Sequence, residues 1–412
     1  MEEQGKLMKK KTITAVLLAC FVLVSCNSAL NADYADNIIQ VQDNSNFDSI
    51  ITIAAENLNN VFYGGELQET YRSLGDANVG AGVYAVFFNN RSAGEVTIYL
   101  YCIERGIVKE RLIYNVNVLS MTYGEKHQKL ILYRDAERFG GSENPDTVIA
   151  LNMDMEEQWR LQIPNRIVAV EAVGDFYYVV STNKNSFDSS SPESVTIIDV
   201  IDSSGRIINT HNRENFEFLT LTTYEDFHIV SGIQIVGDST EAIAIYGNRE
   251  SLFSDRYVVI ENQGRVEYGV IANETLMLTV RTGLNAYLTI IDINDMSIVK
   301  VLDISETTTR YELIPRGFFY GEDRSQIAVI GRAVPHSRLS DERMSLLLIP
   351  ITSEFEVNSV FTIDIGVFDF SIIRDISESE DYMHIVSNSW DFSVLGPDNL
   401  IEFDIRKDLF TQ

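Results

Sequence analysis

The chain has 412 residues, and its 60 acidic and 32 basic side chains give it a formal net charge of −28 at pH 7. This excess of negative charge opposes binding to nucleic acids, whose phosphates are recognised by basic patches. It also opposes adhesion to anionic lipid surfaces by a protein that has no anchor.

The N-terminal segment has the pattern of a secretory signal. Three lysines at positions 9–11 precede an apolar run that ends in Leu23–Cys26. A basic start, a short apolar core and small residues before the cleavage point are typical of a signal peptide, and this run is too short to span a membrane. We therefore predict a signal peptide over residues 1–25. This segment could be an ordinary cleaved signal, a hydrophobic N-terminal helix or the signal of a lipoprotein.

The end of this run, Leu23–Cys26, resembles the lipobox of bacterial lipoproteins, in which cleavage before the cysteine leaves it to be diacylated and N-acylated. The resemblance implies that Cys26 is lipidated, and several acyl chains anchor a protein stably where one binds only marginally. Asn27 resembles the residue that sorts some Gram-negative lipoproteins to the outer membrane. The resemblance thus implies an extracytoplasmic, lipid-anchored protein, with residues 26–36 as a tether.

Apart from Cys26 and Cys20 of the signal peptide, the only cysteine is Cys102, which lies in a predicted strand. One cysteine cannot form an internal disulfide, so the hydrophobic core must supply the stability. We interpret Cys102 as a buried thiol rather than a nucleophile, because no histidine is near it in the sequence.

Beyond residue 37 the chain consists of short β-patterned runs between polar turns, without a long helical periodicity. One kind of apolar run recurs seven times, with starts 46 to 58 residues apart. The runs are Val96–Tyr99, Val148–Leu151, Val195–Ile198, Ala242–Ile245, Leu288–Ile291, Leu346–Ile349 and Leu400–Phe403. A period near 50 residues that is filled by strands is typical of a β-propeller blade of four antiparallel strands. We therefore predict an all-β propeller of about seven four-stranded blades over residues 37–412.

The fourth unit allows two interpretations. Tyr257–Ile260 could be its third strand, but even spacing favours Ala242–Ile245. In the second unit, the segment from Val148 through Asn152 to Trp159 resembles the quinoprotein-type propeller repeat, in which an "ALD…G…W" motif joins the third and fourth strands. That resemblance implies the fold. Because the unit lacks the glycine and has Asn152 in place of aspartate, we expect no bound quinone and no other cofactor.

The two ends of the chain are predicted to meet in the last blade. Residues 37–41 form an apolar run without a blade of their own, and we predict that they supply the outer strand of the last blade, which leaves no exposed edge. Residues 56–82 contain several glycines and are predicted to be an insertion in the first blade, part of which could be helical. An eight-bladed ring and a pair of β-sandwiches are the alternatives, although a sandwich does not explain seven similar units.

Two places in this architecture could carry chemistry. Long loops between predicted second and third strands would open on one face, where loops on a rigid scaffold commonly bind ligands, although each alone is better explained as a solvated hairpin end. The second place is the central channel, whose candidate residues on predicted inner strands are Glu171, Glu267, Arg316 and Asp369. Paired carboxylates there could serve acid–base chemistry, but structural salt bridges are the interpretation that we favour.

Metal motifs are weak, because the five histidines have no ligand spacing and we expect no metal site. The acidic pairs at Asp199/Asp202 and Asp292/Asp295 are explained by Asx turns. We therefore favour a monomeric, non-catalytic propeller that binds an envelope protein, a small ligand or a glycan. The alternatives are a propeller enzyme, a hydrolase or lyase acting on glycans or peptides with carboxylates at the channel mouth, and a ligand-binding envelope sensor.

Overall fold

The computed structural model describes residues 38–41, 51–57, 71–78, 83–90, 95–102, 106–114, 120–134, 146–183, 195–224, 227–237, 239–260, 264–272, 274–305, 311–320, 327–335, 345–357, 361–364, 368–378, 382–391 and 398–406. The predicted signal peptide, Cys26 and the predicted tether lie outside these ranges. No helix within them has the length and apolarity that a membrane span requires.

The described residues form seven antiparallel sheets, which we number in chain order. Sheet 1 consists of β3 (Tyr71–Asn78), β4 (Val83–Asn90), β5 (Glu95–Cys102) and β6 (Gly106–Tyr114). Sheet 2 consists of β7 (Ser120–Gly124), β8 (Lys129–Arg134), β9 (Asp146–Asn152) and β10 (Glu157–Ile163), with the 3-10 turn η1 (Glu125–His127) after β7. Sheet 3 consists of β11 (Arg166–Val173), β12 (Phe176–Thr182), β13 (Val195–Ile201) and β14 (Ile207–Glu214). Sheet 4 consists of β15 (Phe216–Tyr224), β16 (Phe227–Val236), β17 (Ser239–Gly247) and β18 (Tyr257–Ile260).

The remaining three sheets follow the same order. Sheet 5 consists of β19 (Arg265–Ala272), β20 (Thr275–Thr282), β21 (Asn285–Asp292) and β22 (Ser297–Asp303). Sheet 6 consists of β23 (Tyr311–Tyr320), β24 (Ile327–Pro335), β25 (Ser345–Ile351) and β26 (Phe361–Asp364). Sheet 7 combines β27 (Phe368–Glu378), β28 (Tyr382–Asp391) and β29 (Asp398–Arg406) with the N-terminal strands β2 (Ile51–Asn57) and β1 (Ile38–Val41).

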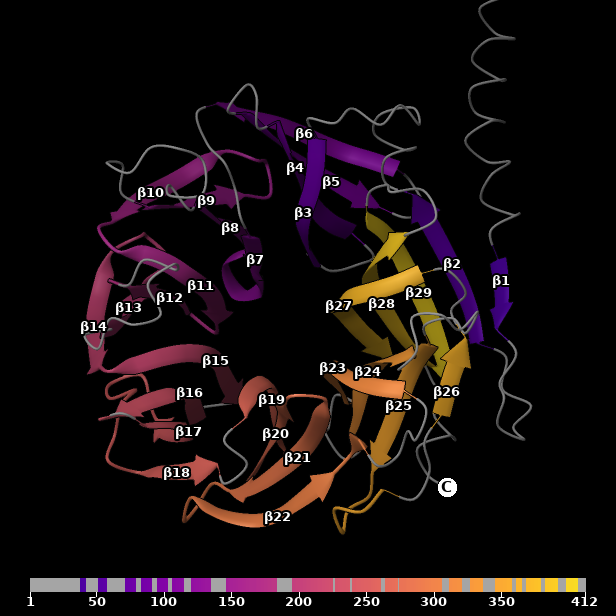
Figure 1. Ribbon diagram of the computed structural model, residues 1–412. Coiled ribbons are helices and arrows are strands. Elements are labelled where there is room, and N and C mark those ends of the chain that lie inside the picture. Colours follow the sequence, from indigo (N-terminus) through magenta and orange to yellow (C-terminus); the bar gives the residue numbers. More distant parts are fainter. Residues whose placement is uncertain are drawn as a thin grey trace, which may run out of the picture.

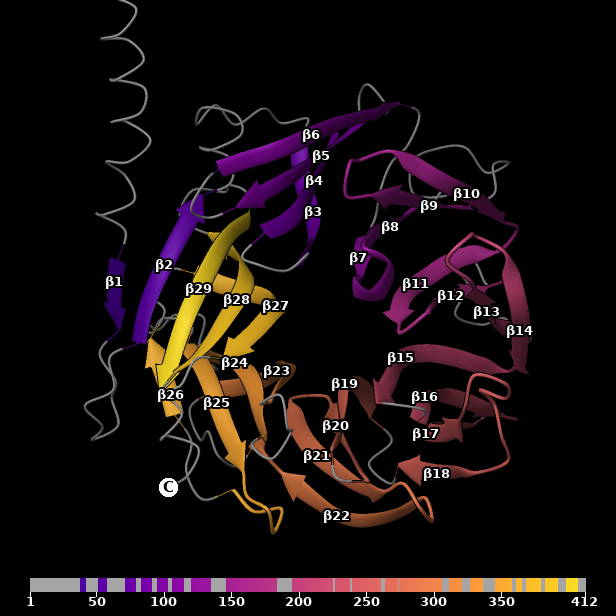
Figure 2. The same ribbon diagram turned by 180° about the vertical axis from the view of Figure 1, so that it is seen from behind.

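The sheets are arranged around a common centre, with the first strand of each innermost (Figure 1 and, from behind, Figure 2). Neighbouring first strands contact each other in most junctions, namely β3 with β7, β7 with β11, β15 with β19, β19 with β23, β23 with β27, and β27 with β3. The junction between sheets 3 and 4 differs. There, within the described ranges, β15 packs against β13 and makes little contact with β11.

The strand assignments from the sequence are confirmed. Each of the seven recurring apolar runs lies in the third strand of its sheet. The ambiguity in the fourth unit is resolved, because Ala242–Ile245 lies in β17 and pairs with Tyr257–Ile260, which is the fourth strand β18. The all-β class with repeated four-stranded antiparallel sheets is therefore correct.

The N-terminal pairing differs in detail from the prediction. The strand that pairs with β29 is β2, with Ile53 opposite Phe403, and residues 38–41 pair with the outer side of β2 instead. The physical reason is length, because the seven residues of β2 offer β29 a longer hydrogen-bonded ladder than the four of β1. The predicted insertion over 56–82 overlaps β3, the first strand of sheet 1, and its residues 58–70 lie outside the described ranges.

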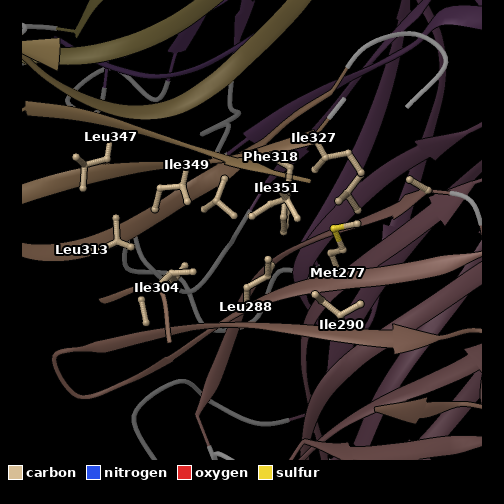
Figure 3. Packing of buried hydrophobic residues seen from close by; sticks show 14 residues of the cluster. Met277, Leu288, Ile290, Ile304, Leu313, Phe318, Ile327, Leu347, Ile349 and Ile351 are labelled. Atoms are coloured by element: carbon tan, nitrogen blue, oxygen red, sulfur yellow. The ribbon is translucent and has the colours of Figure 1, made fainter. Parts of the chain in front are cut away.

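The core lies between neighbouring sheets. Middle strands such as β9 are buried on both faces and are therefore rich in consecutive apolar residues, whereas the fourth strand β14 alternates between exposed and half-buried positions. Figure 3 shows the cluster between sheets 5 and 6, in which Leu288 and Ile290 of β21 lie with Leu347 and Ile349 of β25. Full burial of one such side chain stabilises the fold by about 1.5–3 kcal/mol, so these junctions dominate the stability.

Four consecutive sheets are each linked to the following sheet by a hydrogen bond. The donor is a side chain in or just before the fourth strand of one sheet, and the acceptor is a backbone carbonyl after the third strand of the following sheet. These contacts are Lys109 Nζ to Met153 O (2.8 Å), Trp159 Nε1 to Ser203 O (3.1 Å), His211 Nε2 to Arg249 O (3.1 Å) and Arg256 guanidinium to Ile293 O (3.0 Å). The same turns use the Asx geometry expected from the sequence. In sheet 3, Asp202 Oδ1 accepts the backbone N–H groups of Ser204 (2.9 Å) and Arg206 (3.0 Å).

Candidate binding cleft

A cleft of about 760 Å³ opens between sheets 3 and 4, at the junction where β11 and β15 make little contact. Three connections form it: the turn between β11 and β12, the hairpin between β15 and β16, and the loop between β17 and β18. Its lining residues are Val173, Gly174, Asp175, Phe176, Tyr178, Thr223, Tyr224, His228, Asn248, Arg249 and Glu250. In an antiparallel four-stranded repeat these connections lie at the same end of the sheets, so one face of the ring carries the cleft.

Tyr178 and His228 form the floor of the cleft. The Tyr178 hydroxyl lies 2.9 Å from His228 Nε2, and the two side chains are only 1% and 5% exposed. Burial raises the pKa of Tyr178 to about 12, against an opposing effect of the nearby Arg249 charge, so the phenol is neutral at physiological pH. The floor therefore presents a hydrogen-bonding pair that carries no phenolate charge.

The repeat places these two residues together. Tyr178 lies near the start of β12 and His228 near the start of β16, and they are 50 residues apart, which is one repeat. Second strands of neighbouring sheets face each other across a junction, so side chains near their starts meet at the same end. The spacing of one repeat between Tyr178 and His228 is the signal in the sequence that could have found this pair, whereas the spacing among the five histidines carries none.

The rim is formed by the loop that follows β17. The guanidinium of Arg249 lies 4.7 Å from the centre of the Phe176 ring, a cation–π distance. The loop is held in place because Asn248 Oδ1 accepts the backbone N–H groups of Glu250 and Ser251, each at 2.9 Å. An ordered loop thus presents an exposed arginine whose planar group covers an aromatic ring.

Asp175 closes the cleft on the side of sheet 2. Its carboxylate accepts a hydrogen bond from Lys126 Nζ at 2.6 Å and lies 3.3 Å from His127 Nε2, and both partners come from η1. The Lys126 hydrogen bond is the main cause that lowers the pKa of Asp175. Asp175 is therefore ionised and already paired with a cation.

The four channel candidates all lie on first strands, but none lines the cleft: Glu171 is in β11, Glu267 in β19, Arg316 in β23 and Asp369 in β27. Glu267 and Arg316 occupy the β-bulges of adjacent first strands, between Val266 and Tyr268 and between Pro315 and Gly317. Bulges recur at the same place in β3, β11, β15 and β27. Because most first strands have this bulge, the bulge positions of Glu267 and Arg316 indicate a role in the twist of the sheets rather than in a site.

Glu171 differs from the other candidates in its environment. Desolvation by the surrounding protein raises the pKa of its carboxyl to about 7, although the residue is also exposed to solvent. It lies in sheet 3, and Glu267 lies in sheet 5, so the two carboxylates are not on adjacent strands. The side chain of Asp369 lies outside the described residues.

The long loops expected to carry a binding face lie mostly outside the described residues, and the cleft is at the opposite ends of the strands. Within the described ranges no cluster of histidine, cysteine, aspartate and glutamate could hold a metal ion. The Asx turns proposed for the acidic pairs are present at Asp202 and at Asp292, whose Oδ1 accepts the Asn294 N–H at 2.8 Å.

No protein-family model matches the chain, and neither does any curated protein sequence. Its fold is similar to that of the β-propeller domain of the Trilobed protease from Pyrococcus furiosus, with 11% identity, a TM-score of 0.51, and coverage of 82% of this chain and 94% of that one. It is also similar to a chain of the mitotic checkpoint complex, with 11% identity, a TM-score of 0.52, and coverage of 88% and 93%. A third similar structure is Pyrococcus horikoshii acylaminoacyl peptidase, with 11% identity, a TM-score of 0.50, and coverage of 78% and 51%. At these identities the similarity shows the fold alone: the chain has a β-propeller fold.

Proposed function

We propose that the chain is a lipoprotein of the cell envelope, anchored through Cys26 to the cell membrane, or to the outer membrane in a Gram-negative cell, and that its propeller is a non-catalytic binding scaffold. Residues 1–25 would be the signal peptide, 26–36 the tether, and 37–412 the propeller. The lipobox-like run Leu23–Cys26 supports the anchor, and the polar segment after Cys26 suits a tether.

We further propose that the propeller is a monomeric, closed ring of seven blades. Seven sheets, the contact of β27 with β3, and the pairing of β2 with β29 support this arrangement. Pairing the two ends of the chain in one sheet would tie the ring together and protect the edge of β29.

The observation that carries the binding function is the cleft between sheets 3 and 4. It combines an exposed arginine, aromatic side chains and a buried hydrogen-bonding pair within a concave space, which is the usual make-up of a ligand site. Catalysis by channel carboxylates is less well supported, because Glu171 and Glu267 lie on sheets that are not adjacent.

The function is tested by site-specific photo-cross-linking in living cells. A photo-reactive amino acid at position 250, on the cleft rim, should yield a reproducible adduct, and the same group at Leu284 should not. Leu284 is a matched control because it is 60% exposed and lies in the β20–β21 turn, at the other end of the strands. Equal labelling from both positions, or none from position 250, would contradict a binding role for the cleft.

The anchor is tested separately by fractionation of cells that produce the Cys26→Ser variant. We expect the variant to leave the membrane fraction and to appear as soluble protein, because it lacks the acylated thiol. Retention of the variant in the outer membrane would contradict lipidation at Cys26.

A further inference from the structure

We infer that the cleft between sheets 3 and 4 binds an uncharged carbohydrate, such as a short neutral segment of a glycan. The inference rests on the proposed binding function and specifies its ligand class. Three features of the cleft carry it: its charge balance, the hydrogen-bonding capacity of its floor, and the kind of side chain at its wall.

The charges at the cleft balance one another, in contrast with the strongly acidic chain as a whole. Asp175 is paired with Lys126, and the two remaining charged side chains, Arg249 and Glu250, have opposite signs. A charged ligand bound in a partly desolvated site needs an uncompensated counter-charge, because the loss of its hydration is otherwise too costly. A neutral polar ligand meets no such cost here.

The floor suits a hydroxyl group. The hydrogen between the Tyr178 oxygen and His228 Nε2 belongs to one of them only. If the phenol donates it, the Tyr178 oxygen accepts from a ligand; if the imidazole donates it, the Tyr178 hydrogen is available to the ligand. A sugar hydroxyl is itself both donor and acceptor, so it can bond to the pair in either arrangement.

The wall provides aromatic and planar polar groups. Tyr224 offers aromatic surface, and Arg249, whose guanidinium covers the Phe176 ring, offers a planar group with several donors, as do Asn248 and Glu250 with their donors or acceptors. The volume of about 760 Å³ lies within the roughly 300–1,000 Å³ of small-ligand sites. An extended peptide normally adds to an open strand edge, whereas this lining comes mainly from turns and from side chains at strand ends.

The test is a glycan array probed with the purified full-length protein in detergent, with neutral, sialylated and uronic-acid glycans and a set of neutral peptides on one surface. We expect binding to at least one neutral glycan. Retention of acidic glycans only, of peptides only, or of no probe would overturn the inference. The cross-linking at position 250 would still report whether the cleft binds a partner, so failure of the ligand class and failure of the proposed function are distinguishable.

Three variants locate the binding. Tyr178→Phe should weaken the affinity for the captured glycan about tenfold, the effect of one lost hydrogen bond in a desolvated site. Arg249→Ala should weaken it by a similar factor, because it removes a charged donor, whose hydrogen bonds are stronger. Tyr177→Phe is the matched control, since it removes the same group from the neighbouring residue, which packs against sheet 2. Arg249 is exposed, so its variant is expected to fold even if Tyr178→Phe does not. Equal affinity of Arg249→Ala and wild type, or an equal loss in Tyr177→Phe, would contradict this location.

Discussion

Tyr177 and Tyr178 are neighbours in β12, yet they face two junctions of the ring that close in different ways. Alternation along the strand directs Tyr177 into the core between sheets 2 and 3 and Tyr178 into the core between sheets 3 and 4. Burial raises the pKa of each phenol to about 12. The Tyr178 hydroxyl bonds to His228, whereas the Tyr177 hydroxyl has no hydrogen-bond partner among the described residues.

Glycines explain why the junction between sheets 2 and 3 is closed. A Cβ on Gly124 would lie 2.7 Å from the Tyr177 ring, and one on Gly205 would lie 2.7 Å from the Trp159 ring. Both rings therefore pack directly on backbone.

The junction between sheets 3 and 4 lacks this packing. His228 in sheet 4 occupies the position that Tyr177 occupies in sheet 3. Tyr177 pairs with Ala172, and His228 pairs with Thr223, and each of these pairs is the second from the turn between the first and second strands. The shorter histidine bonds to Tyr178, and nothing lies within 4 Å of a Cβ placed on Gly174. One residue type at one repeat position thus distinguishes a packed junction from a cleft.

The largest effect is expected from Gly205→Ala. The residue has φ of +86°, and its new Cβ would overlap Trp159, so left-handed strain and overpacking together should cost about 3 kcal/mol. Gly174→Ala is the matched control, since its φ is +56° and its surroundings are open, and it should cost about 1 kcal/mol. Urea unfolding measures both, and equal losses would show that the Trp159 contact does not constrain the junction.

Trp159→Ala should cost about 2 kcal/mol, less than for a fully buried tryptophan because the ring is half-buried. It also removes the hydrogen bond to Ser203 O. Combined with Gly205→Ala it should be non-additive, because without the indole the alanine retains only its backbone strain. Simple additivity in the double-mutant cycle would contradict direct packing of Trp159 on Gly205.

The two tyrosines should respond in opposite directions to loss of the hydroxyl. Tyr178→Phe breaks the bond to His228 and should lower the free energy of unfolding by about 1 kcal/mol. Tyr177→Phe removes a buried hydroxyl that has no partner among the described residues, and should leave stability unchanged or raise it by up to about 1 kcal/mol. Equal losses in the two variants would show that the junctions do not differ in this way.

The sequence predicted what depends on local pattern. Third strands such as β9 are buried on both faces, so runs such as Val148–Leu151 stand out as apolar segments between polar turns. The sequence does not distinguish 37–41 from 51–57 as the partner of β29, because both segments have a strand pattern and the choice depends on pairing between the chain ends. The cleft was missed because it depends on which side chains meet across a junction, and Tyr178 and His228 are one repeat apart.

The smallest effect concerns Glu171, because this residue is exposed and solvent screening should leave less than about 1 kcal/mol of its pKa shift as stability. The folded pKa of Glu171 is about 7, above the roughly 4.3 of an unfolded glutamate, so the folded state binds more protons between these values. Stability from this group is therefore lost as the pH rises through that window. As the pH is raised from 5 to 8, the free energy of unfolding of Glu171→Gln should therefore increase relative to that of the wild type. Urea unfolding at a series of pH values measures this difference.

Asp202→Asn is the control for that comparison. Hydrogen bonds, first that from the Ser204 hydroxyl, lower the pKa of Asp202, so its carboxylate is ionised in both folded and unfolded chains above pH 5. The stability that it contributes is lost only at lower pH, as the pH falls through its folded pKa. Between pH 5 and pH 8 this variant should therefore differ from wild type by a constant amount, while the difference for Glu171→Gln changes. Parallel profiles for the two variants would show that solvent hydrates Glu171 in the folded protein as fully as in the unfolded chain.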